Sequence, residues 1–353
     1  MPVVDADTHI DEPEEAWASM EGSAARFRPT TITPADGAQV PGFDASANRW
    51  WLVDGRMRQR MIRDDDLTGT TLESRELLDV SARVRDMDRM GVDIHVIFPT
   101  FFLGYITGNP EAEIALTKSY GQYVAQKCAE SEGRLRWTAV LPLLDIDASI
   151  AHLRWAKEHG ACGVFKRGLE YGKRASDPYW FPLYEEAESL DMPICIHTGN
   201  GNPSDGRLGH GDGLGGVPVM DAFHALLLYE VPKKFPKLRF GFIEAGSTWV
   251  PYVVDRLVAE QKRRQWVRRF ELGSDLFRSN RLFVAVDPVE DISHLLELGT
   301  EDSLMIGSDY THFDTSAQPD ALMQIRTWVE EGRISETVGR KILEDNPTKF
   351  YGF

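Results

Sequence analysis

Two carboxylates and an imidazole stand at alternate positions near the start of the chain, in the run Asp5-Ala6-Asp7-Thr8-His9. Side chains at i, i+2 and i+4 of an extended strand point the same way, so Asp5, Asp7 and His9 would line one face. Two valines precede the run and favour a strand there. Because a carboxylate and an imidazole at this spacing can reach one ion, Asp7 and His9 are candidate metal ligands.

Four later apolar runs each end in a residue that could join such a site. These runs read GVFK, PICIH, FGFIE and LMIGSD, and they end at Lys166, His197, Glu244 and Asp309. In a barrel of parallel strands the carboxyl ends meet at one rim, where active sites lie. Burying several charges together is costly without compensation, which a metal cation would provide. We therefore expect all four to converge with Asp7 and His9 on a metal centre.

Eight β-rich runs alternate with amphipathic helical patterns along most of the chain. Strands that are apolar almost throughout and alternate with helices indicate a parallel sheet. Eight such units predict a closed (β/α)8 TIM barrel of the α/β class, and we expect one domain over residues 1–353. The expected strands are Val3–His9, His95–Thr100, Leu135–Leu143, Ala161–Gly168, Met192–His197, Leu238–Glu244, Leu282–Asp287 and Ser303–Asp309.

Two regions interrupt or extend this alternation. Residues 17–78 are rich in Pro, Gly and Asp and include a hairpin pattern that turns at Asp54-Gly55. Loops of this length are uncommon unless they are lids or disordered segments, so we expect an insertion that folds over the barrel mouth, with a peripheral decoration as the alternative. After the eighth strand, helical patterns at Pro319–Glu331 and Ser335–Glu344 predict extra helices that pack on the barrel.

The composition favours an enzyme that acts on a small molecule. Of the 353 residues, 42% are hydrophobic, and the net charge is −16. An acidic balance of this size argues against binding to nucleic acid. No run approaches the roughly 18 apolar residues of a membrane span, and no basic segment followed by an apolar stretch opens the chain. We expect a cytoplasmic protein with no membrane partner, and a homo-oligomer is left open.

Several motifs in order along the chain resemble one enzyme family. They are Asp7-Thr8-His9, His197 in HTGNG, FIEAGSTWVPY, Asp309 in GSDYTH, and the closing ILEDNPTKFY. The combination resembles the amidohydrolase superfamily, in the amidohydrolase-related branch that includes the aminocarboxymuconate semialdehyde decarboxylases. The resemblance covers nearly the whole chain and implies a metal-dependent enzyme on a barrel fold. Two positions depart from the pattern: Asp7 stands where many members have histidine, and Glu244 where the mononuclear decarboxylases and hydratases of the branch have a catalytic histidine.

These departures define three candidate catalytic residues, Glu244, Lys166 and His312. In binuclear amidohydrolases a carboxylated lysine of the fourth strand bridges two metals, and the resemblance implies that role for Lys166. A neutral lysine that ligates directly and a lysine paired with a carboxylate at the rim are the alternatives. His312 lies three residues after Asp309 and could supply an imidazole or support a ligand.

The donor set also bears on the metal. Asp7, His9, His197 and Asp309 suffice for one ion, and Glu244 with Lys166 would complete a second site. We expect two metal ions. Because the donors are oxygen and nitrogen with no thiolate, we expect iron, with zinc or manganese as alternatives.

Three chemistries remain open for such a centre. Its carboxylate-rich pattern is similar to that of the non-haem diiron monooxygenase that hydroxylates a terpenoid thioester in platensimycin biosynthesis. The preferred prediction is therefore a diiron monooxygenase of natural-product biosynthesis. It would use dioxygen and a reductant on a hydrophobic, terpenoid-like substrate that could be linked to coenzyme A. The alternatives are a hydrolase of an ester, amide or thioester and a non-oxidative decarboxylase or hydratase.

Two features could bind such a substrate. The basic segment KRRQWVRR places Arg264 and Arg268 on one helical face, where they could dock the phosphates of an acyl-CoA. A solvated helix face is the alternative. Trp51 and neighbouring aromatic residues lie in segments that lead to the barrel mouth and could line an apolar pocket, with aromatic core packing as the alternative.

Overall fold

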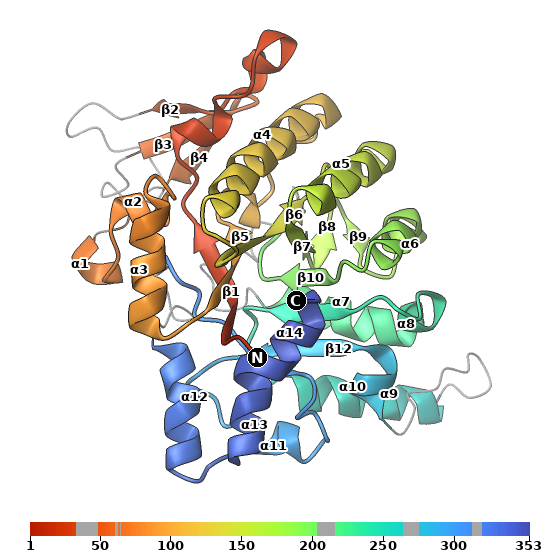
Figure 1. Cartoon of the computed structure of the whole chain (residues 1–353). Helices are drawn as coiled ribbons and strands as arrows, with labels where there is room; N and C mark the ends of the chain where they lie inside the picture. Colours follow the sequence, from red (N-terminus) through yellow and green to blue (C-terminus); the bar gives the residue numbers. More distant parts are fainter. Residues whose placement is uncertain (33–48, 61–62, 64, 203–215, 264–274, 313–319) are drawn as a thin grey trace.

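Eight parallel strands form a nearly closed barrel in the computed structural model (Figure 1), which describes residues 1–32, 49–60, 63, 65–202, 216–263, 275–312 and 320–353. Every neighbouring pair in the sheet is parallel. The first and last strands approach each other through a bridge between Thr8 and Tyr310. The strands, in sheet order, are β1 (Val4–Ile10), β5 (Ile94–Pro99), β6 (Leu135–Val140), β7 (Ala161–Arg167), β10 (Ile194–His197), β11 (Phe240–Ile243), β12 (Leu282–Val286) and β13 (Leu304–Ile306). All eight expected strands are thus present, and the predicted TIM barrel is confirmed.

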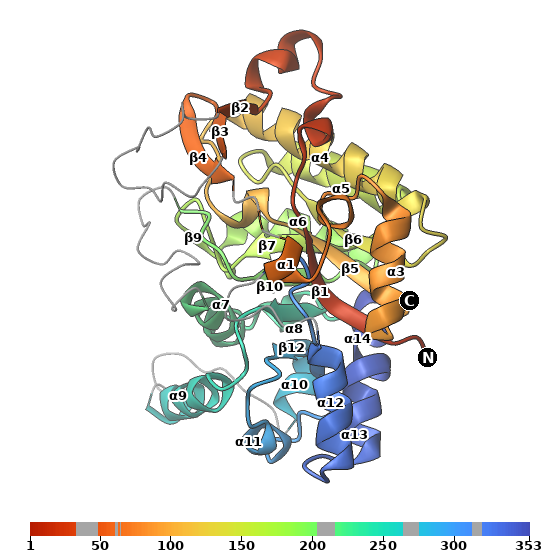
Figure 2. The ribbon, with the colours of Figure 1, turned by 90° about the vertical axis from the view of Figure 1, so that its left-hand side faces the viewer.

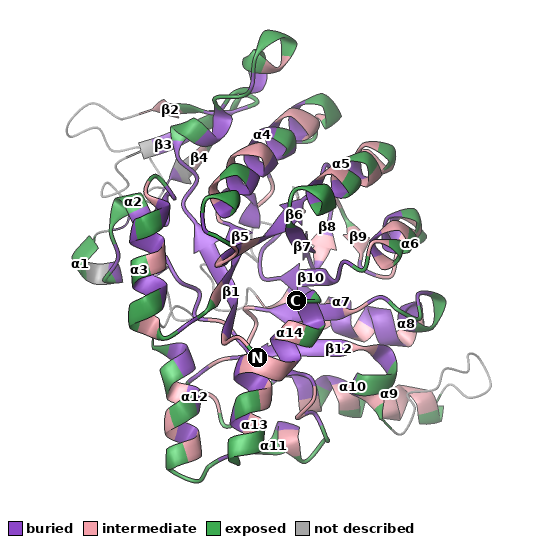
Figure 3. Cartoon of the chain, in the orientation of Figure 1, coloured by how far each residue is buried: buried purple, intermediate pink, exposed green. Residues whose placement is uncertain are grey.

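The barrel strands are buried on both faces, as Figure 3 shows. Helices cover the outside and side chains fill the inside, which explains why the strands read as almost continuous apolar runs. Figure 2 shows the helices arranged around the sheet. Those between the barrel strands are α3 (Val80–Met90), α4 (Pro110–Ala129), α5 (Ile146–Glu158), α6 (Phe181–Ser189), α7 (Val217–Leu228), α8 (Val231–Lys234), α9 (Val250–Arg263), α10 (Leu276–Asn280) and α11 (Ser293–Leu296).

Side-chain caps fix where two of these helices begin. The side chain of Asn109 accepts a hydrogen bond from the backbone N–H of Glu111 at the start of α4. Asp145 does the same for Ala148 at the start of α5. Each cap satisfies a backbone donor that the helix leaves unpaired, so each helix begins directly after the loop at the carboxyl end of the preceding strand. Residues in those loops are therefore held at the barrel mouth.

The insertion after β1 contains a small antiparallel sheet. It comprises two 3₁₀ helices (Glu14–Trp17 and Gly22–Phe27), β2 (Thr30–Ile32), β3 (Arg49–Val53), β4 (Arg56–Arg60), α1 (Asp65–Thr68) and α2 (Leu72–Arg75). The expected hairpin turns at Asp54-Gly55, where both residues have positive φ as a tight hairpin requires. The guanidinium of Arg58 donates to the carbonyl of Phe101, 2.9 Å away, just beyond the end of β5. The hairpin thus packs against a loop at the carboxyl end of the barrel.

The C-terminal helices close the opposite end. They are α12 (Ala321–Glu330), α13 (Glu336–Arg340), a π-helical turn (Lys341–Asp345) and α14 (Asn346–Tyr351), and Figure 1 shows α14 lying across the barrel. The ring of Phe350 packs on Phe283, and a Cβ added at Gly241 would lie only 2.3 Å from it. The Tyr351 hydroxyl donates to the carbonyl of Ala6 at 2.7 Å. These side chains fill the amino-terminal end of the barrel and leave the carboxyl end for a site. No described helix is long and apolar enough to cross a membrane.

Candidate metal centre

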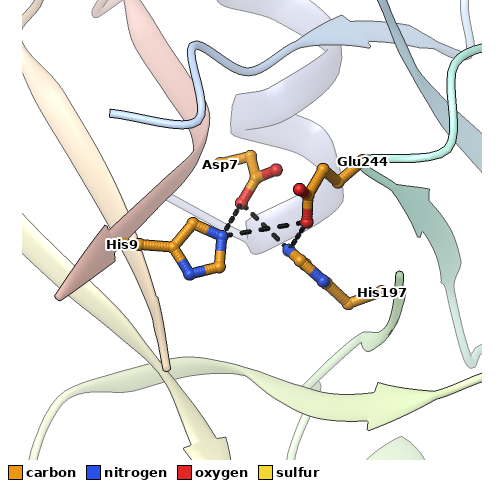
Figure 4. A group of neighbouring side chains, drawn as sticks. All are labelled: Asp7, His9, His197 and Glu244. Carbon is orange, nitrogen blue, oxygen red and sulfur yellow. Dashed lines mark hydrogen bonds and ion pairs between the residues drawn. The ribbon is translucent and has the colours of Figure 1, made fainter. Parts of the chain in front are cut away.

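Four side chains from three strand ends meet at the carboxyl end of the barrel (Figure 4). Nε2 of His197 lies 3.3 Å from Oδ1 of Asp7 and 3.1 Å from Oε2 of Glu244. Nε2 of His9 lies 3.5 Å from Oδ1 of Asp7 and 4.0 Å from Oε2 of Glu244. One donor atom from each residue lies within 4.8 Å of all the others. The structure therefore brings together Asp7, His9, His197 and Glu244, as the sequence predicts.

Both imidazoles of this group are oriented by backbone carbonyls. Nδ1 of His9 lies 3.1 Å from the carbonyl of Pro99, and Nδ1 of His197 lies 2.8 Å from the carbonyl of Thr198. A carbonyl oxygen only accepts hydrogen bonds, so Nδ1 of each ring donates to its carbonyl and Nε2 faces the carboxylates. The ring of Phe98 packs against both, with its centroid 6.1 Å from that of His9 and 5.0 Å from that of His197.

Asp309 and His312 adjoin this group. Oδ1 of Asp309 lies 3.3 Å from Nε2 of His9 and 2.7 Å from Nδ1 of His312. The rings of His9 and His312 stack with their centroids 4.0 Å apart. Nε2 of His312 hydrogen-bonds the hydroxyl of Thr100 at 2.9 Å. The structure therefore places both residues in the site where the sequence predicts them.

The two acidic residues that follow strands occupy left-handed backbone conformations. Glu244 has a φ of 53° and Asp309 a φ of 52°. Residues other than glycine are uncommon in this region, and each costs of order 1–3 kcal/mol unless its surroundings enforce it. A close approach also shapes the other side of the site, because a Cβ added at Gly307 would lie 2.3 Å from Cβ of Asp7. The backbone here is thus held in shapes that bring carboxylates to the centre.

Electrostatics favour a cation between these atoms. Three carboxylates and two imidazoles lie within a few ångströms of one another, and their side chains are at most 3% exposed. Burial alone would lower the pKa of His197, but the charges of Asp7 and Glu244 raise that pKa to about 9. The same carboxylates would attract a divalent ion at the inward Nε2 atoms. Oxygen and imidazole donors suit zinc, manganese or iron, so the residues fit a bound metal.

A family comparison decides what kind of barrel this is. The model of the family described as amidohydrolase matches residues 4–353, almost the whole chain. The chain belongs to the amidohydrolase family. This confirms the family resemblance, and with the site geometry it identifies a metal-dependent enzyme of that fold.

Proteins that are similar in sequence to this amidohydrolase include decarboxylases. A gamma-resorcylate decarboxylase from Polaromonas is 26% identical over 75% of this chain and 85% of its own. A 2-amino-3-carboxymuconate-6-semialdehyde decarboxylase from Dictyostelium discoideum is 25% identical over 78% of this chain and 77% of its own. The resemblance to the decarboxylase branch is therefore supported. The preferred prediction of a diiron monooxygenase receives no support, because these relatives are named as decarboxylases.

Solved structures share the fold. An amidohydrolase from Mycobacterium avium has a TM-score of 0.76 at 19% identity and covers 99% of both chains. A 5-carboxyvanillate decarboxylase from Novosphingobium aromaticivorans was solved with bound manganese; its TM-score is 0.66 at 20% identity, covering 80% of this chain and 83% of its own. At 19% and 20% identity these structures show the shared fold, whereas the expectation of a metal is supported by the donor residues at the barrel mouth.

Lys166 lies away from the group of Asp7, His9, His197 and Glu244, so the structure does not place its side chain where the predicted role as a metal ligand or bridge requires it. In the sheet register His197 pairs with Arg167 and Ile196 pairs with Lys166. Because alternate residues of a strand face opposite sides, Lys166 faces outward when His197 faces inward. Its Nζ lies over the ring of Trp180 at 4.4 Å and donates to the carbonyl of Arg167 at 3.3 Å. Burial lowers its pKa to about 8.

The predicted substrate-binding residues have different outcomes. Trp51 is only 3% exposed and packs edge-to-face with Trp17 and Phe101, while the guanidinium of Arg60 lies 4.8 Å from its ring. Its indole is packed among these side chains, so it does not form the wall of an open pocket. Arg264 and Arg268 lie outside the described residues.

A buried polar layer behind the ligands was not predicted. Asp5 accepts hydrogen bonds from the N–H and hydroxyl of Ser308, and burial raises the pKa of Asp5 to about 7. The guanidinium of Arg83 donates to the carbonyl of His9 at 3.0 Å and to Nδ1 of His95 at 3.1 Å. These contacts join β1, β5 and the end of β13. Alternation predicted Asp5 on one face with Asp7 and His9, but the register of β1 shifts between Asp5 and Thr8 and Asp5 is not in the group of donors. Nothing in the helix sequence marks Arg83.

Proposed function

We propose that this amidohydrolase is a metal-dependent, non-oxidative decarboxylase of a small aromatic carboxylate. The observation that carries the proposal is the buried group of Asp7, His9, His197 and Glu244 at the barrel mouth. The decarboxylase relatives that align over at least three quarters of the chain support this chemistry over oxygenation. A solved relative was crystallised with 2,6-dihydroxybenzoate, which suggests the substrate class.

The geometry favours one ion rather than the two that were expected. His9 belongs both to the group with Asp7, His197 and Glu244 and to the group with Asp309 and His312. Its Nδ1 is engaged by the carbonyl of Pro99, so Nε2 faces both groups. One imidazole nitrogen has a single lone pair and can bind only one ion. With Lys166 turned away, we infer that the described residues form a single site.

The remaining residues then divide the work of a decarboxylation. A divalent ion held by His9, His197 and the carboxylates would supply a Lewis acid for an oxygen of the substrate. When the bond to the carboxylate carbon breaks, its electron pair stays on the ring carbon, which must gain a proton. Nδ1 of His312 lies 2.7 Å from Oδ1 of Asp309, and this pair can deliver the proton. Glu244 contributes a negative charge where the branch has a histidine, so the proton would come from the Asp309 side.

The proposal is tested with manganese-loaded protein and two probes, 2,6-dihydroxybenzoate and 5-carboxyvanillate. We expect release of CO₂ with formation of the decarboxylated arene, at the same rate with and without air. In D₂O the product should carry one deuterium on the carbon that lost the carboxylate. His312→Asn should lower kcat roughly 100-fold, since general acid catalysis is typically worth 10²–10⁴-fold.

Other outcomes would reject this function. Turnover only with dioxygen and a reductant would restore the oxygenase. Hydrolysis of aryl esters without CO₂ release from either probe would favour a hydrolase.

A further inference from the structure

The carboxylate of Glu290 joins the loops that follow two neighbouring barrel strands, β11 and β12. Oε1 accepts from the backbone N–H of Ser247 at 2.7 Å and of Thr248 at 3.0 Å. Oε2 accepts from the hydroxyl of Ser247 at 2.5 Å and from the backbone N–H of Asp287 at 3.0 Å. Hydrogen bonds to an ionised acceptor are roughly twice as strong as neutral ones, so four donors on one carboxylate hold these loops firmly.

The loop held in this way carries Glu244. Glu244 and Gly246 both have left-handed backbone conformations, with φ of 53° and 59°. A Cβ added at Gly246 would lie 2.6 Å from Oε1 of Glu290, so this turn packs directly on the carboxylate. On the opposite side, the hydroxyl of Thr198 donates to the carbonyl of Glu244. A strained residue persists only where its surroundings over-determine it, and Thr198 and Glu290 supply those surroundings.

We propose that Glu290 is a positioning residue that holds the carboxylate of Glu244 at the metal centre. This role rests on the proposed function, because it takes Glu244 as part of the metal site. Glu290 acts through the turn from 244 to 248 and lies outside the group of donor atoms. Without its carboxylate the N–H groups of Ser247 and Thr248 lose their acceptor, and Glu244 is free to return to a negative φ that redirects its side chain.

The chain offers a matched control at the other end of the same strand. Oε1 of Glu188 accepts from the backbone N–H of Lys237 at 2.6 Å and of Leu238 at 3.3 Å, just before β11. Glu188→Ala and Glu290→Ala therefore both remove a carboxylate from backbone donors beside β11. Only Glu290 lies at the end that carries a candidate metal ligand.

The experiment measures Mn²⁺ affinity of metal-depleted protein by the electron paramagnetic resonance signal of free Mn²⁺, alongside thermal unfolding. We expect Glu290→Ala to weaken binding 10–100-fold, the usual cost of losing a residue that supports a metal ligand. Glu290→Gln keeps one acceptor oxygen and should fall between wild type and Glu290→Ala. Glu188→Ala should bind Mn²⁺ within about twofold of wild type, although its melting temperature falls.

The outcomes separate this role from the proposed function. If wild type does not bind Mn²⁺, or Glu244→Gln binds it equally well, the metal assignment fails and this role fails with it. If wild type binds and Glu244→Gln binds more weakly, unchanged affinity in Glu290→Ala overturns the positioning role alone. Equal losses in Glu188→Ala and Glu290→Ala would show a general effect of stability and also overturn it. Should Glu290→Ala not fold, Gly246→Ala, which displaces the same carboxylate, must weaken binding.

Discussion

The candidate metal centre is built from two kinds of backbone. Asp7, His9 and His197 lie within strands and their side chains point toward the centre, although the pairing of β1 with β5 shifts register between Asp5 and Thr8. Glu244 and Asp309 lie beyond strand ends, in left-handed conformations that other parts of the fold must enforce. The first set belongs to the barrel itself, whereas the second depends on loops.

This difference suggests a division of roles. Strand residues are fixed by the ladder and by buried neighbours on both sides, so they can hold a metal rigidly. Turn residues are held in place by a few hydrogen bonds, such as those of Glu290 to Ser247 and Thr248. Their strain is a cost to stability that is retained where it serves a site. Perturbing the strand set should therefore abolish the site, and perturbing the turn set should weaken it.

The largest effect should come from His197→Ala. His197 is fully buried, its Nδ1 is fixed by the carbonyl of Thr198, and its Nε2 faces both Asp7 and Glu244. Supporting residues already cost 10–100-fold in metal affinity, so loss of this ligand should exceed 100-fold. Mn²⁺ content after gel filtration would check this. Full occupancy in the variant would remove His197 from the ligand set and contradict the idea that residues within strands hold the metal most firmly.

A smaller effect is expected from Glu244→Gly. Glycine adopts a left-handed conformation without strain, so the free energy of unfolding of the metal-free variant should exceed that of wild type by about 1 kcal/mol. Its melting temperature should rise accordingly. Its Mn²⁺ affinity should fall about 10–100-fold because the turn loses its carboxylate. Glu230 provides a control, since it also has a φ of 53° but directly precedes α8 and lies outside the group of candidate ligands.

Glu230→Gly should show the same gain in stability with unchanged Mn²⁺ affinity. A Glu244→Gly variant that is less stable than wild type without metal would contradict the idea that the turn is strained for the sake of the site.

The barrel could be predicted because its pattern repeats. Eight apolar runs separated by helical stretches admit few arrangements, and each expected strand is present. The way in which the C-terminal helix α14 packs against the barrel could not be predicted from such a repeating pattern. α14 plugs the barrel because Gly241 leaves room for Phe350, and such complementarity between distant residues leaves no periodic signal.

The site was predictable where chemistry and alternation agreed and not where they conflicted. Asp7 and His9 alternate on one strand, and His197 ends another, so strand geometry places them. Lys166 also ends an apolar run, but the run GVFK does not reveal which face its last residue takes. That face depends on the register with β10, which pairs Ile196 with Lys166. Glu290 could not be found either, because its role depends on loops that meet only in the folded chain.

The smallest effect on the metal should come from Lys166→Met, which tests whether facing outward removes a strand-end residue from the centre. Lys166 is fully buried against Trp180, and methionine keeps its apolar stem. We expect Mn²⁺ affinity within about twofold of wild type. Loss of a metal ion, or of a signal from a carboxylated lysine, would return Lys166 to the site and overturn the register argument.

Stability should respond to Lys166→Met in a pH-dependent way. Burial lowers the pKa of Lys166 from 10.5 to about 8, so between these pH values the unfolded chain binds more protons than the folded chain. Stability of the wild type relative to the variant should therefore rise as pH increases from about 8 to about 10.5, by on the order of 3 kcal/mol. Below pH 8 the difference should be constant, with the wild type bearing the cost of a buried charge. Parallel unfolding curves for the two proteins across this range would mean that Lys166 finds compensation in the folded state, as a metal-linked lysine would.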